Sequence, residues 1–236
     1  MDKHATHRIV GHGVCMLLQV LIFLNMHRKL EKNLATHPEL QDFAVMLPRF
    51  MTVWNVGFQV MYSYLALACD FTTGFKIESV VPTWLRKFRF TFAVGVLYPW
   101  SSAILSFWVF FFYDRELILP QHLDIVVSPA CNFVWHGFIM VYALWELKFL
   151  PQLQKTLASF TLLITTTCLY TGVLFYTRYV DLGRWPYAIL ALNEGTKYES
   201  ILIWVVALGG IYNYFVQFRL KNYLEGRQNK LCTVAE

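Results

Sequence analysis

Hydrophobic residues are concentrated in six long runs along the chain, and shorter polar stretches separate them. The runs cover approximately residues 9–26, 47–68, 90–112, 125–145, 157–177 and 201–218. Each run approaches the ~20 residues that an α-helix needs to cross the hydrocarbon core of a bilayer. The runs lack the alternation of a membrane β-barrel, and isolated strands would leave backbone polar groups unpaired in lipid. The pattern therefore predicts one domain, residues 1–236, with an all-α fold: a polytopic membrane bundle of six transmembrane helices.

Two prolines refine this prediction. Residues 39–47 form a short amphipathic stretch that could lie on the membrane surface, and Pro48 follows it. Proline fits the first turn of a helix, where its missing N–H costs no hydrogen bond. In the third run, Pro99 removes one helical hydrogen bond, so we expect a kink there.

The composition agrees with a lipid environment. Hydrophobic residues make up 57% of the chain and charged residues only 15%, whereas about 25% is usual in soluble domains. Six spans place both termini on one side, which carries 12 of the 20 Lys and Arg residues. The positive-inside rule then predicts cytoplasmic termini. The expected location is the plasma membrane or an endomembrane such as the endoplasmic reticulum, and the sequence does not determine which of them it is.

Charge and cysteine content exclude other classes of protein. The net charge of +5 can be met by anionic lipid headgroups, and nothing else in the sequence favours binding of nucleic acid. The five cysteines form no CxxC pair, so neither a disulfide framework nor a zinc site is indicated. The sequence predicts no metal site.

His136 is the first candidate for chemistry, because it lies in the middle of the fourth apolar run. An ionisable ring at membrane depth is costly and is read as a functional position by default. Asn132 lies one helical turn away and could fix the tautomer of the imidazole. A buried neutral histidine is a competent general base. The alternative is a structural histidine that bonds the backbone of a neighbouring helix.

Thr52 is the second candidate, and it shares one helical face with Asn55 and Gln59. A threonine hydroxyl becomes a nucleophile only when a base takes its proton, and His136 is the candidate base within the runs. An acyl-threonine intermediate would need oxyanion donors, which Asn55 or Asn132 could supply. Such a polar stripe can equally serve only to join helices.

The predicted helix starts place these two residues at different depths. His136 would lie ~16 Å into a helix that begins at Ile125, and Thr52 only ~8 Å into one that begins at Leu47. Helix tilt, or an earlier start near Phe43, could bring them to the same level.

Four short segments carry a family resemblance and span residues 49–187. They are Arg-Phe-Met-Thr-Val-Trp-Asn at 49–55 with Gln59, Phe-Trp at 107–108 with Tyr-Asp-Arg-Glu at 113–116 and Pro120, Leu-Asp at 123–124 with Asn132 and His136, and Gly183 with Trp-Pro-Tyr at 185–187. Together these segments resemble the androgen-induced-gene family of six-span membrane proteins. The stretch from Tyr-Asp-Arg-Glu to His136 is the most specific part.

The resemblance implies a threonine hydrolase that cleaves fatty acid esters of hydroxy fatty acids within the bilayer. The family's nucleophilic threonine falls on Thr52, and its essential histidine falls on His136. The chain departs from the family pattern in the order Trp-Pro-Tyr at 185–187, in the lack of an evident Gly-Glu near residues 217–219, and at two single positions. Phe133 replaces a second histidine, and Ala130 replaces a tryptophan.

The residues and the resemblance together predict an intramembrane lipid-ester hydrolase that needs no cofactor. Thr52 would be the nucleophile, His136 the general base and then acid, and Asn132 and Asn55 supporting groups. Arg49 or Arg89 could hold a fatty-acid carboxylate. The expected partners are a lipid ester and the bilayer, and the sequence does not determine the oligomeric state.

Two alternatives belong to other functional classes. A non-catalytic membrane scaffold, or a lipid-binding or partner-regulating protein, would use Thr52 and His136 only to join two helices. A transporter is a weaker alternative, because the six predicted spans contain no charged pair and the chain shows no internal repeat.

Overall fold

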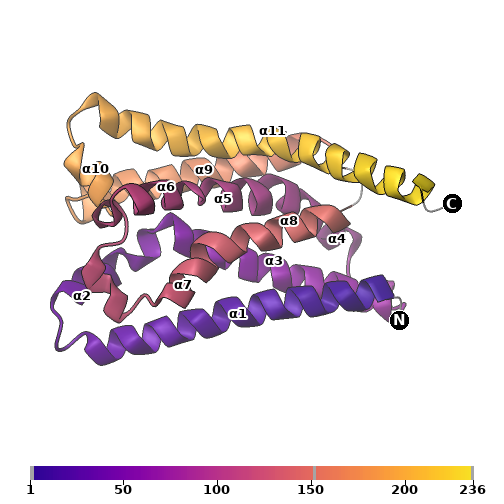
Figure 1. Cartoon of the computed structure of the whole chain (residues 1–236), viewed down its shortest axis with the longest axis horizontal. Helices are drawn as coiled ribbons and strands as arrows, with labels where there is room; N and C mark the ends of the chain where they lie inside the picture. The colour runs from indigo at the N-terminus through magenta and orange to yellow at the C-terminus, as the bar shows by residue number, and fades with distance from the viewer. Residues whose placement is uncertain (1–2, 151–152, 235–236) are drawn as a thin grey trace.

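The computed structural model describes residues 3–150 and 153–234, and within these residues it contains helices and no strand. The long helices run side by side along one axis (Figure 1). The α-helices are α1 (Lys3–Asn33), α2 (Glu39–Met46), α3 (Met51–Gly74), α4 (Thr83–Phe92), α5 (Tyr98–Ala103), α6 (Ser106–Tyr113), α7 (Pro129–Phe133), α8 (Ile139–Phe149), α9 (Leu157–Tyr176), α10 (Ala188–Leu192) and α11 (Lys197–Val234). The predicted all-α fold is confirmed.

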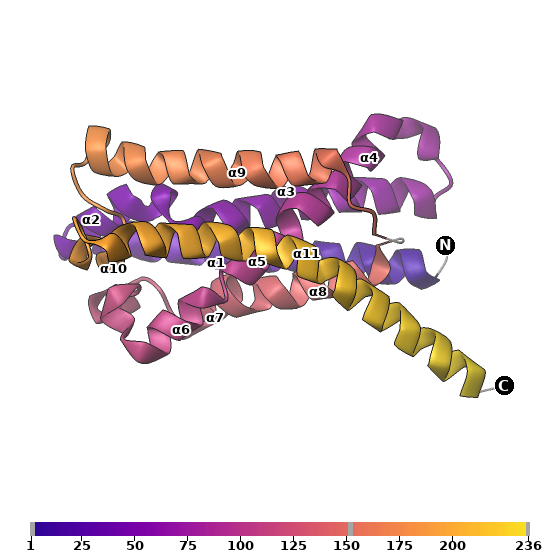
Figure 2. The ribbon, with the colours of Figure 1, turned by 90° about the horizontal axis from the view of Figure 1, so that it is seen from above.

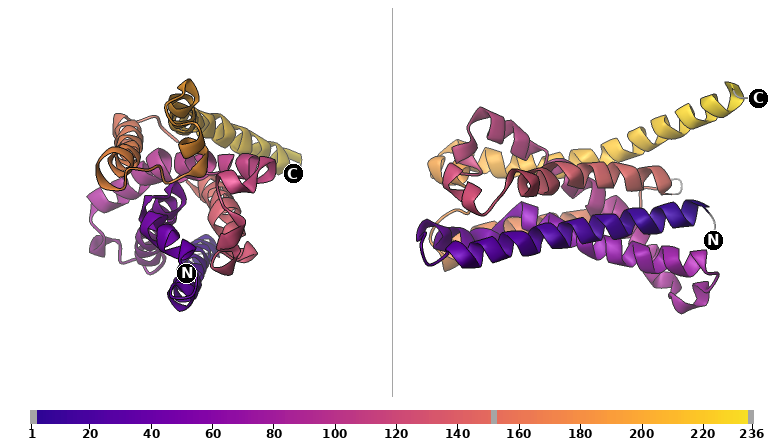
Figure 3. Two further views of the ribbon diagram at one scale, coloured as in Figure 1. Left: turned by 90° about the vertical axis from the view of Figure 1, so that its left-hand side faces the viewer. Right: turned by 60° about the horizontal axis from the view of Figure 1, so that its bottom comes forward.

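Short irregular turns connect these helices. The 3₁₀ turns cover Leu47–Arg49, Glu78–Val80, Arg115–Leu117 and Gln121–Ile125, and the π turns cover Ala93–Leu97, Val134–Phe138 and Thr177–Asp181. The short helices α2 and α10 lie at one end of the bundle, and both ends of the chain lie at the other (Figures 1 and 2). The second half of α11 diverges from the bundle (Figures 2 and 3).

Four helical segments are long and apolar enough to cross a membrane. They are Ala5–Asn33, Thr83–Tyr113, Leu157–Asp181 and Lys197–Gly226. The other two predicted spans fall on α3 and on residues 129–149, which are helical but do not meet this standard. Six spans are therefore not confirmed, and the four segments indicate a multi-pass membrane protein.

The predicted start of the fourth span at Ile125 is wrong by four residues, because α7 begins at Pro129. The Ser128 hydroxyl accepts a hydrogen bond from the Cys131 N–H at 3.3 Å and caps this helix. The preceding residues form a 3₁₀ turn rather than a regular helix. Hydropathy does not detect this boundary, because Ile125 to Val127 are as apolar as the helix itself.

The second predicted span also begins later than expected. Pro48 lies in the 3₁₀ turn Leu47–Arg49, and Phe50 adopts an extended backbone with φ −77° and ψ 134°. This residue interrupts the helical path, so α3 begins at Met51 and Thr52 lies in its first turn.

The helix around Pro99 is irregular on its N-terminal side, whereas the kink expected at Pro99 stays a prediction. The π turn Ala93–Leu97 directly precedes α5, and the Tyr98 N–H donates to the Ala93 carbonyl. Gly95 lies in this turn, where an added Cβ would come within 2.4 Å of the Ser159 carbonyl oxygen. The turn therefore packs against α9 at a distance that only glycine allows.

Candidate active site

Thr52 and His136 meet at the end of the bundle that also carries α2. The Thr52 Oγ1 atom lies 3.0 Å from the His136 Nε2 atom. The other ring nitrogen, Nδ1, lies 3.0 Å from the backbone carbonyl oxygen of Asn132. Since a carbonyl oxygen only accepts, Nδ1 carries the proton and Nε2 presents its lone pair to the hydroxyl. This tautomer is the one that can take a proton from Thr52.

Two aromatic residues of α6 hold the histidine in place. The His136 ring stacks on Phe107, with ring centroids 3.5 Å apart and an interplanar angle of 14°. The Trp108 Nε1–H donates to the His136 carbonyl oxygen at 2.8 Å. His136 lies within the π turn Val134–Phe138, a departure from the α-helix that often occurs at functional sites. Both the ring and its backbone are therefore fixed.

The structure brings Thr52 and His136 together although they lie at different distances from the starts of their own helices. His136 lies seven residues after Pro129, which corresponds to ~10 Å along a helix instead of ~16 Å. Thr52 lies in the first turn of α3. Their side chains are nevertheless 3.0 Å apart, so the two helices start at different levels along the bundle and no earlier start of the second helix is needed.

The N-terminus of α3 presents a backbone donor beside the Thr52 hydroxyl. The Met51 N–H donates to the Tyr187 hydroxyl at 2.7 Å, and the Val53 N–H donates to the Phe50 carbonyl at 3.0 Å. Within residues 3–150 and 153–234, the Thr52 N–H between them makes no hydrogen bond. Such N–H groups lie at the positive end of the helix dipole, which favours negative charge.

Thr52 and His136 open onto a cavity of about 480 Å³. Its walls come from α3, α5, α6, α9, α10 and α11 and are predominantly apolar. Among the described residues, no Lys, Arg, Asp or Glu lines it. Val109 of α6 and Val205 of α11 both line the cavity and are exposed, so it reaches the outer surface of the bundle between these helices. A cavity of this size is typical of small-molecule sites, which span about 300–1,000 Å³.

Of the two predicted supporting residues, Asn132 contacts the histidine, but through its backbone carbonyl rather than its side chain. The Asn132 Oδ1 atom has no hydrogen-bond partner among the described residues. Asn55 is fully buried, does not line the cavity, and leaves both polar side-chain atoms unpaired within the described chain. The structure therefore does not bring the Asn55 amide to the cavity.

The two candidate arginines do not line the cavity, and each is bound by carboxylates of the protein itself. Arg49 pairs with Asp181 in the π turn after α9. Arg89 pairs with Asp70 through two bonds of 2.7 and 3.0 Å, and its Nη2 lies 3.3 Å from Glu146. The expected contact of Arg89 with a substrate carboxylate is therefore not supported by its position.

Two tyrosines that were not singled out as site residues position the start of α3. The Tyr170 hydroxyl lies 3.0 Å from that of Tyr187 and donates to the Arg49 carbonyl at 3.3 Å. With the bond from Met51, these hydroxyls tie α9 and the segment before α10 to the turn that precedes Thr52. Tyr187 belongs to one of the segments that carry the family resemblance, and this membership is the sequence feature that could have identified it as a site residue.

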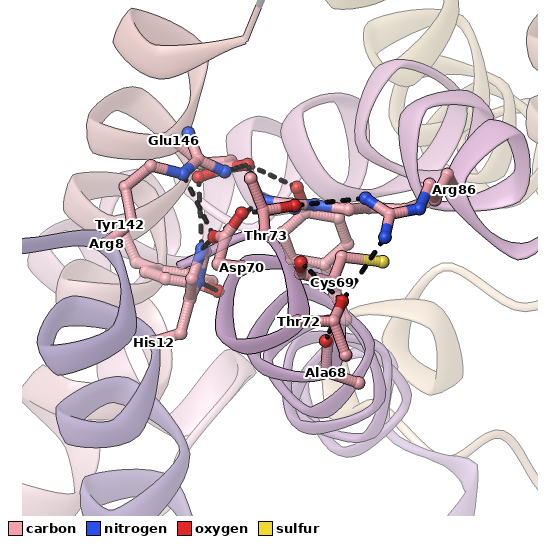
Figure 4. A network of polar contacts seen from close by, with 12 residues as sticks. Arg8, His12, Ala68, Cys69, Asp70, Thr72, Thr73, Arg86, Tyr142 and Glu146 are labelled. Atoms are coloured by element: carbon pink, nitrogen blue, oxygen red, sulfur yellow. Dashed lines mark hydrogen bonds and ion pairs between the residues drawn. The ribbon is translucent and has the colours of Figure 1, made fainter. Parts of the chain in front are cut away.

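Figure 4 shows a second polar cluster, which joins α1, α3 and α8. It lies near the start of α1, at the end of the bundle opposite α2 (Figure 1). Arg8 contacts Asp70 and Glu146, each at 3.0 Å, and Arg89 bridges the same two carboxylates. His12 Nε2 lies 3.2 Å from Asp70. The two arginines balance the two carboxylates in charge, and none of these residues lines the cavity.

Hydropathy placed this cluster outside the membrane, because each charged member lies one or two residues beyond a predicted span. The helices continue past those limits and pair the charges with one another. The part of the chain that the structure describes contains no group of three or more His, Cys, Asp or Glu side chains placed to hold a metal ion.

Comparison with known proteins identifies the family. The model of the FAR-17a/AIG1-like protein family matches residues 14–222. The androgen-dependent TFPI-regulating protein of Homo sapiens is 27% identical over 145 residues, which cover 61% of this chain and 62% of that protein. The protein of the same name from Mesocricetus auratus is 33% identical over 99 residues, covering 41% of this chain and 42% of that protein. No solved structure matches the chain.

The chain thus spans less than two thirds of the length of the relatives it matches. The family match is nevertheless almost coextensive with the helical bundle, and it includes Thr52, His136 and the walls of their cavity. The chain belongs to the FAR-17a/AIG1-like family of proteins.

Proposed function

We propose that this protein hydrolyses lipid esters within the bilayer, with Thr52 as the nucleophile and His136 as the general base. The supporting observation is the 3.0 Å contact between Thr52 Oγ1 and His136 Nε2, with Nδ1 engaged by the Asn132 carbonyl. A nucleophile within hydrogen-bond reach of a base, itself oriented by a third group, is the arrangement that activates a hydroxyl.

The reaction follows from these positions. His136 Nε2 takes the hydroxyl proton as Thr52 Oγ1 attacks the ester carbonyl carbon, which forms a tetrahedral oxyanion. The unpaired Thr52 N–H, at the positive end of α3, stabilises that charge. His136 then gives its proton to the departing alkoxide, which leaves an acyl-threonine. Water attacks the acyl group, His136 takes the water proton and returns it to the Thr52 oxygen as the fatty acid departs.

The cavity and the family favour a lipid substrate. A long apolar ester matches the apolar walls, and the opening between Val109 and Val205 allows entry sideways from the leaflet. We propose fatty acid esters of hydroxy fatty acids as the substrates, because the family resemblance centres on Thr52 and His136. The bilayer and this lipid ester are then the partners of the chain.

A fluorophosphonate probe tests the proposal, because an activated hydroxyl displaces its fluoride and becomes covalently labelled. Membranes that contain the wild type or Thr52→Ser should be labelled, whereas Thr52→Ala and His136→Ala should not. Hydrolysis of a fatty acid ester of a hydroxy fatty acid, followed by mass spectrometry, should show the same order. Equal labelling of all four proteins would refute the mechanism and favour the non-catalytic membrane scaffold.

A further inference from the structure

The cavity continues past Thr52 toward the middle of the bundle. Leu202 and Gly210 both line it, and they are eight residues apart on α11, which corresponds to ~12 Å along the helix. Leu163 of α9 and Asn213 of α11 also line this inner part. We call this part of the cavity, bounded by Leu163, Gly210 and Asn213, the inner arm.

Gly210 has an unusual combination of properties. The residue is buried, yet a Cβ atom added to it would meet no other atom within 4 Å. A buried position normally has close neighbours, because protein interiors are densely packed. Since Gly210 lines the cavity, the empty space beside it is the inner arm. The side chain of a larger residue at this position would extend into the arm.

The charges around the cavity decide which half of the substrate enters the arm. No Lys, Arg, Asp or Glu among the described residues lines the cavity. An unpaired carboxylate buried there would lose its hydration without compensation, at a cost of several kcal/mol. The carboxylate-bearing hydroxy-acid half must therefore stay outside. The acyl chain carries no charge and matches the apolar walls.

We infer that the inner arm binds the acyl chain of the ester, with the methyl end at Gly210. Gly210 is then the residue that determines the longest acyl chain the site accepts. This inference rests on the proposed ester hydrolysis at Thr52, since it assigns the two halves of that substrate to the two sides of the reacting carbonyl.

A substitution that shortens the arm tests this assignment. The test measures kcat/KM for a series of esters of one hydroxy fatty acid, with acyl chains from hexanoyl to palmitoyl. The wild type, Gly210→Leu and Gly172→Leu are compared. Gly172 of α9 is the matched control, because it also has free space beside it but is exposed and lies outside this cavity.

Gly210→Leu should lower kcat/KM for the palmitoyl ester by at least about tenfold relative to the hexanoyl ester, since each misplaced methylene costs 10–200-fold. Gly172→Leu should keep the chain-length profile of the wild type. An unchanged profile in Gly210→Leu, or an equal loss for short and long chains, would overturn the inference.

Photo-crosslinking gives a readout that does not require turnover. The Thr52→Ala protein is irradiated with a palmitoyl ester that carries a diazirine at the methyl end of the acyl chain. Crosslinks should map to the peptides around Leu163 and Asn213, and Gly210→Leu should abolish them while Gly172→Leu retains them.

The two readouts separate the inference from the proposed function. Crosslinks at α2 or α10 would refute the inner arm as the acyl site, even in an active hydrolase. Crosslinks at the inner arm of Thr52→Ala, together with a wild type that neither hydrolyses the ester nor is labelled at Thr52, would refute the proposed function and uphold the acyl site.

Discussion

Thr52 and His136 are 84 positions apart in the sequence, and the Thr52 Oγ1 atom lies 3.0 Å from the His136 Nε2 atom. The first turn of α3 supplies the hydroxyl, and the π turn between α7 and α8 supplies the ring. The backbone carbonyl of Asn132 selects the tautomer that leaves Nε2 free to accept. A hydroxyl and a base that can take its proton therefore lie together in the wall of one apolar cavity.

Replacing His136 by glutamine should lower kcat for ester hydrolysis by about 10²–10⁴-fold, the usual contribution of a general base. Glutamine can accept a hydrogen bond from Thr52 but is too weak a base to take its proton. The fold should persist, so the variant is compared with the wild type by thermal unfolding as well as by kcat. A folded His136→Gln protein with normal kcat would contradict the role of the base.

Replacing Tyr187 by phenylalanine should destabilise the start of α3. The Met51 N–H loses the acceptor that it contacts at 2.7 Å, and an unsatisfied buried N–H costs about 1–3 kcal/mol. The free energy of unfolding in detergent measures this loss, and kcat should fall because Thr52 follows Met51 directly. Tyr179→Phe is the control, because Tyr179 is exposed and belongs to the same stretch of chain. Equal stability of both variants would contradict this role of Tyr187.

Breaking the ionic cluster around Asp70, at the end of the bundle opposite Thr52, should lower the free energy of unfolding and leave kcat nearly unchanged. Asp70→Asn leaves Arg8 and Arg89 without one of their two carboxylates. Removing one member of a buried ion pair typically costs about 3–5 kcal/mol. The free energy of unfolding should fall, while the folded fraction keeps its kcat because Asp70 does not line the cavity.

The exposed pair formed by Arg115 and Asp124 is the control for this prediction. Asp124→Asn should change the free energy of unfolding by only ~0–1 kcal/mol, because surface ion pairs are weak. A similar effect of Asp70→Asn and Asp124→Asn would show that the buried cluster does not stabilise the bundle.

The ion pair between Asp42 and Arg184 predicts a pH dependence outside the membrane. The hydrogen bonds from the Arg184 guanidinium, at 2.9 and 2.6 Å, lower the pKa of the Asp42 carboxyl. Because the folded pKa is the lower one, the stabilisation is present above the unfolded pKa of about 3.9 and is lost as the pH falls through the folded value.

Asp42→Asn should therefore be slightly less stable than the wild type near neutral pH, and the difference should shrink to zero in acid. Thermal unfolding of both proteins over an acidic pH series measures it. A difference that stays constant down to the lowest pH would show that the Asp42 charge is not the cause.

Particular residues show why the sequence predicted some boundaries and missed others. The apolar run around Phe90 to Phe112 continues through Pro99, and hydropathy did not predict the π turn Ala93–Leu97 that precedes this proline. Residues 125–128 are equally apolar but form no regular helix, because Ser128 caps α7 one residue before Pro129. Hydropathy detects burial in lipid, whereas a cap is a local hydrogen bond.

The sequence by itself predicted the all-α fold, six membrane spans and the joint action of Thr52 and His136, and four of the helical segments are long and apolar enough to cross a membrane. It could do so because periodic apolar runs report local structure and because the family segments contain both residues. Only the tertiary structure decided that Arg89 pairs with Asp70 and Glu146, that the Asn132 carbonyl holds the ring, and that Gly210 faces empty space. These are contacts between distant segments, and their partners depend on how the helices pack.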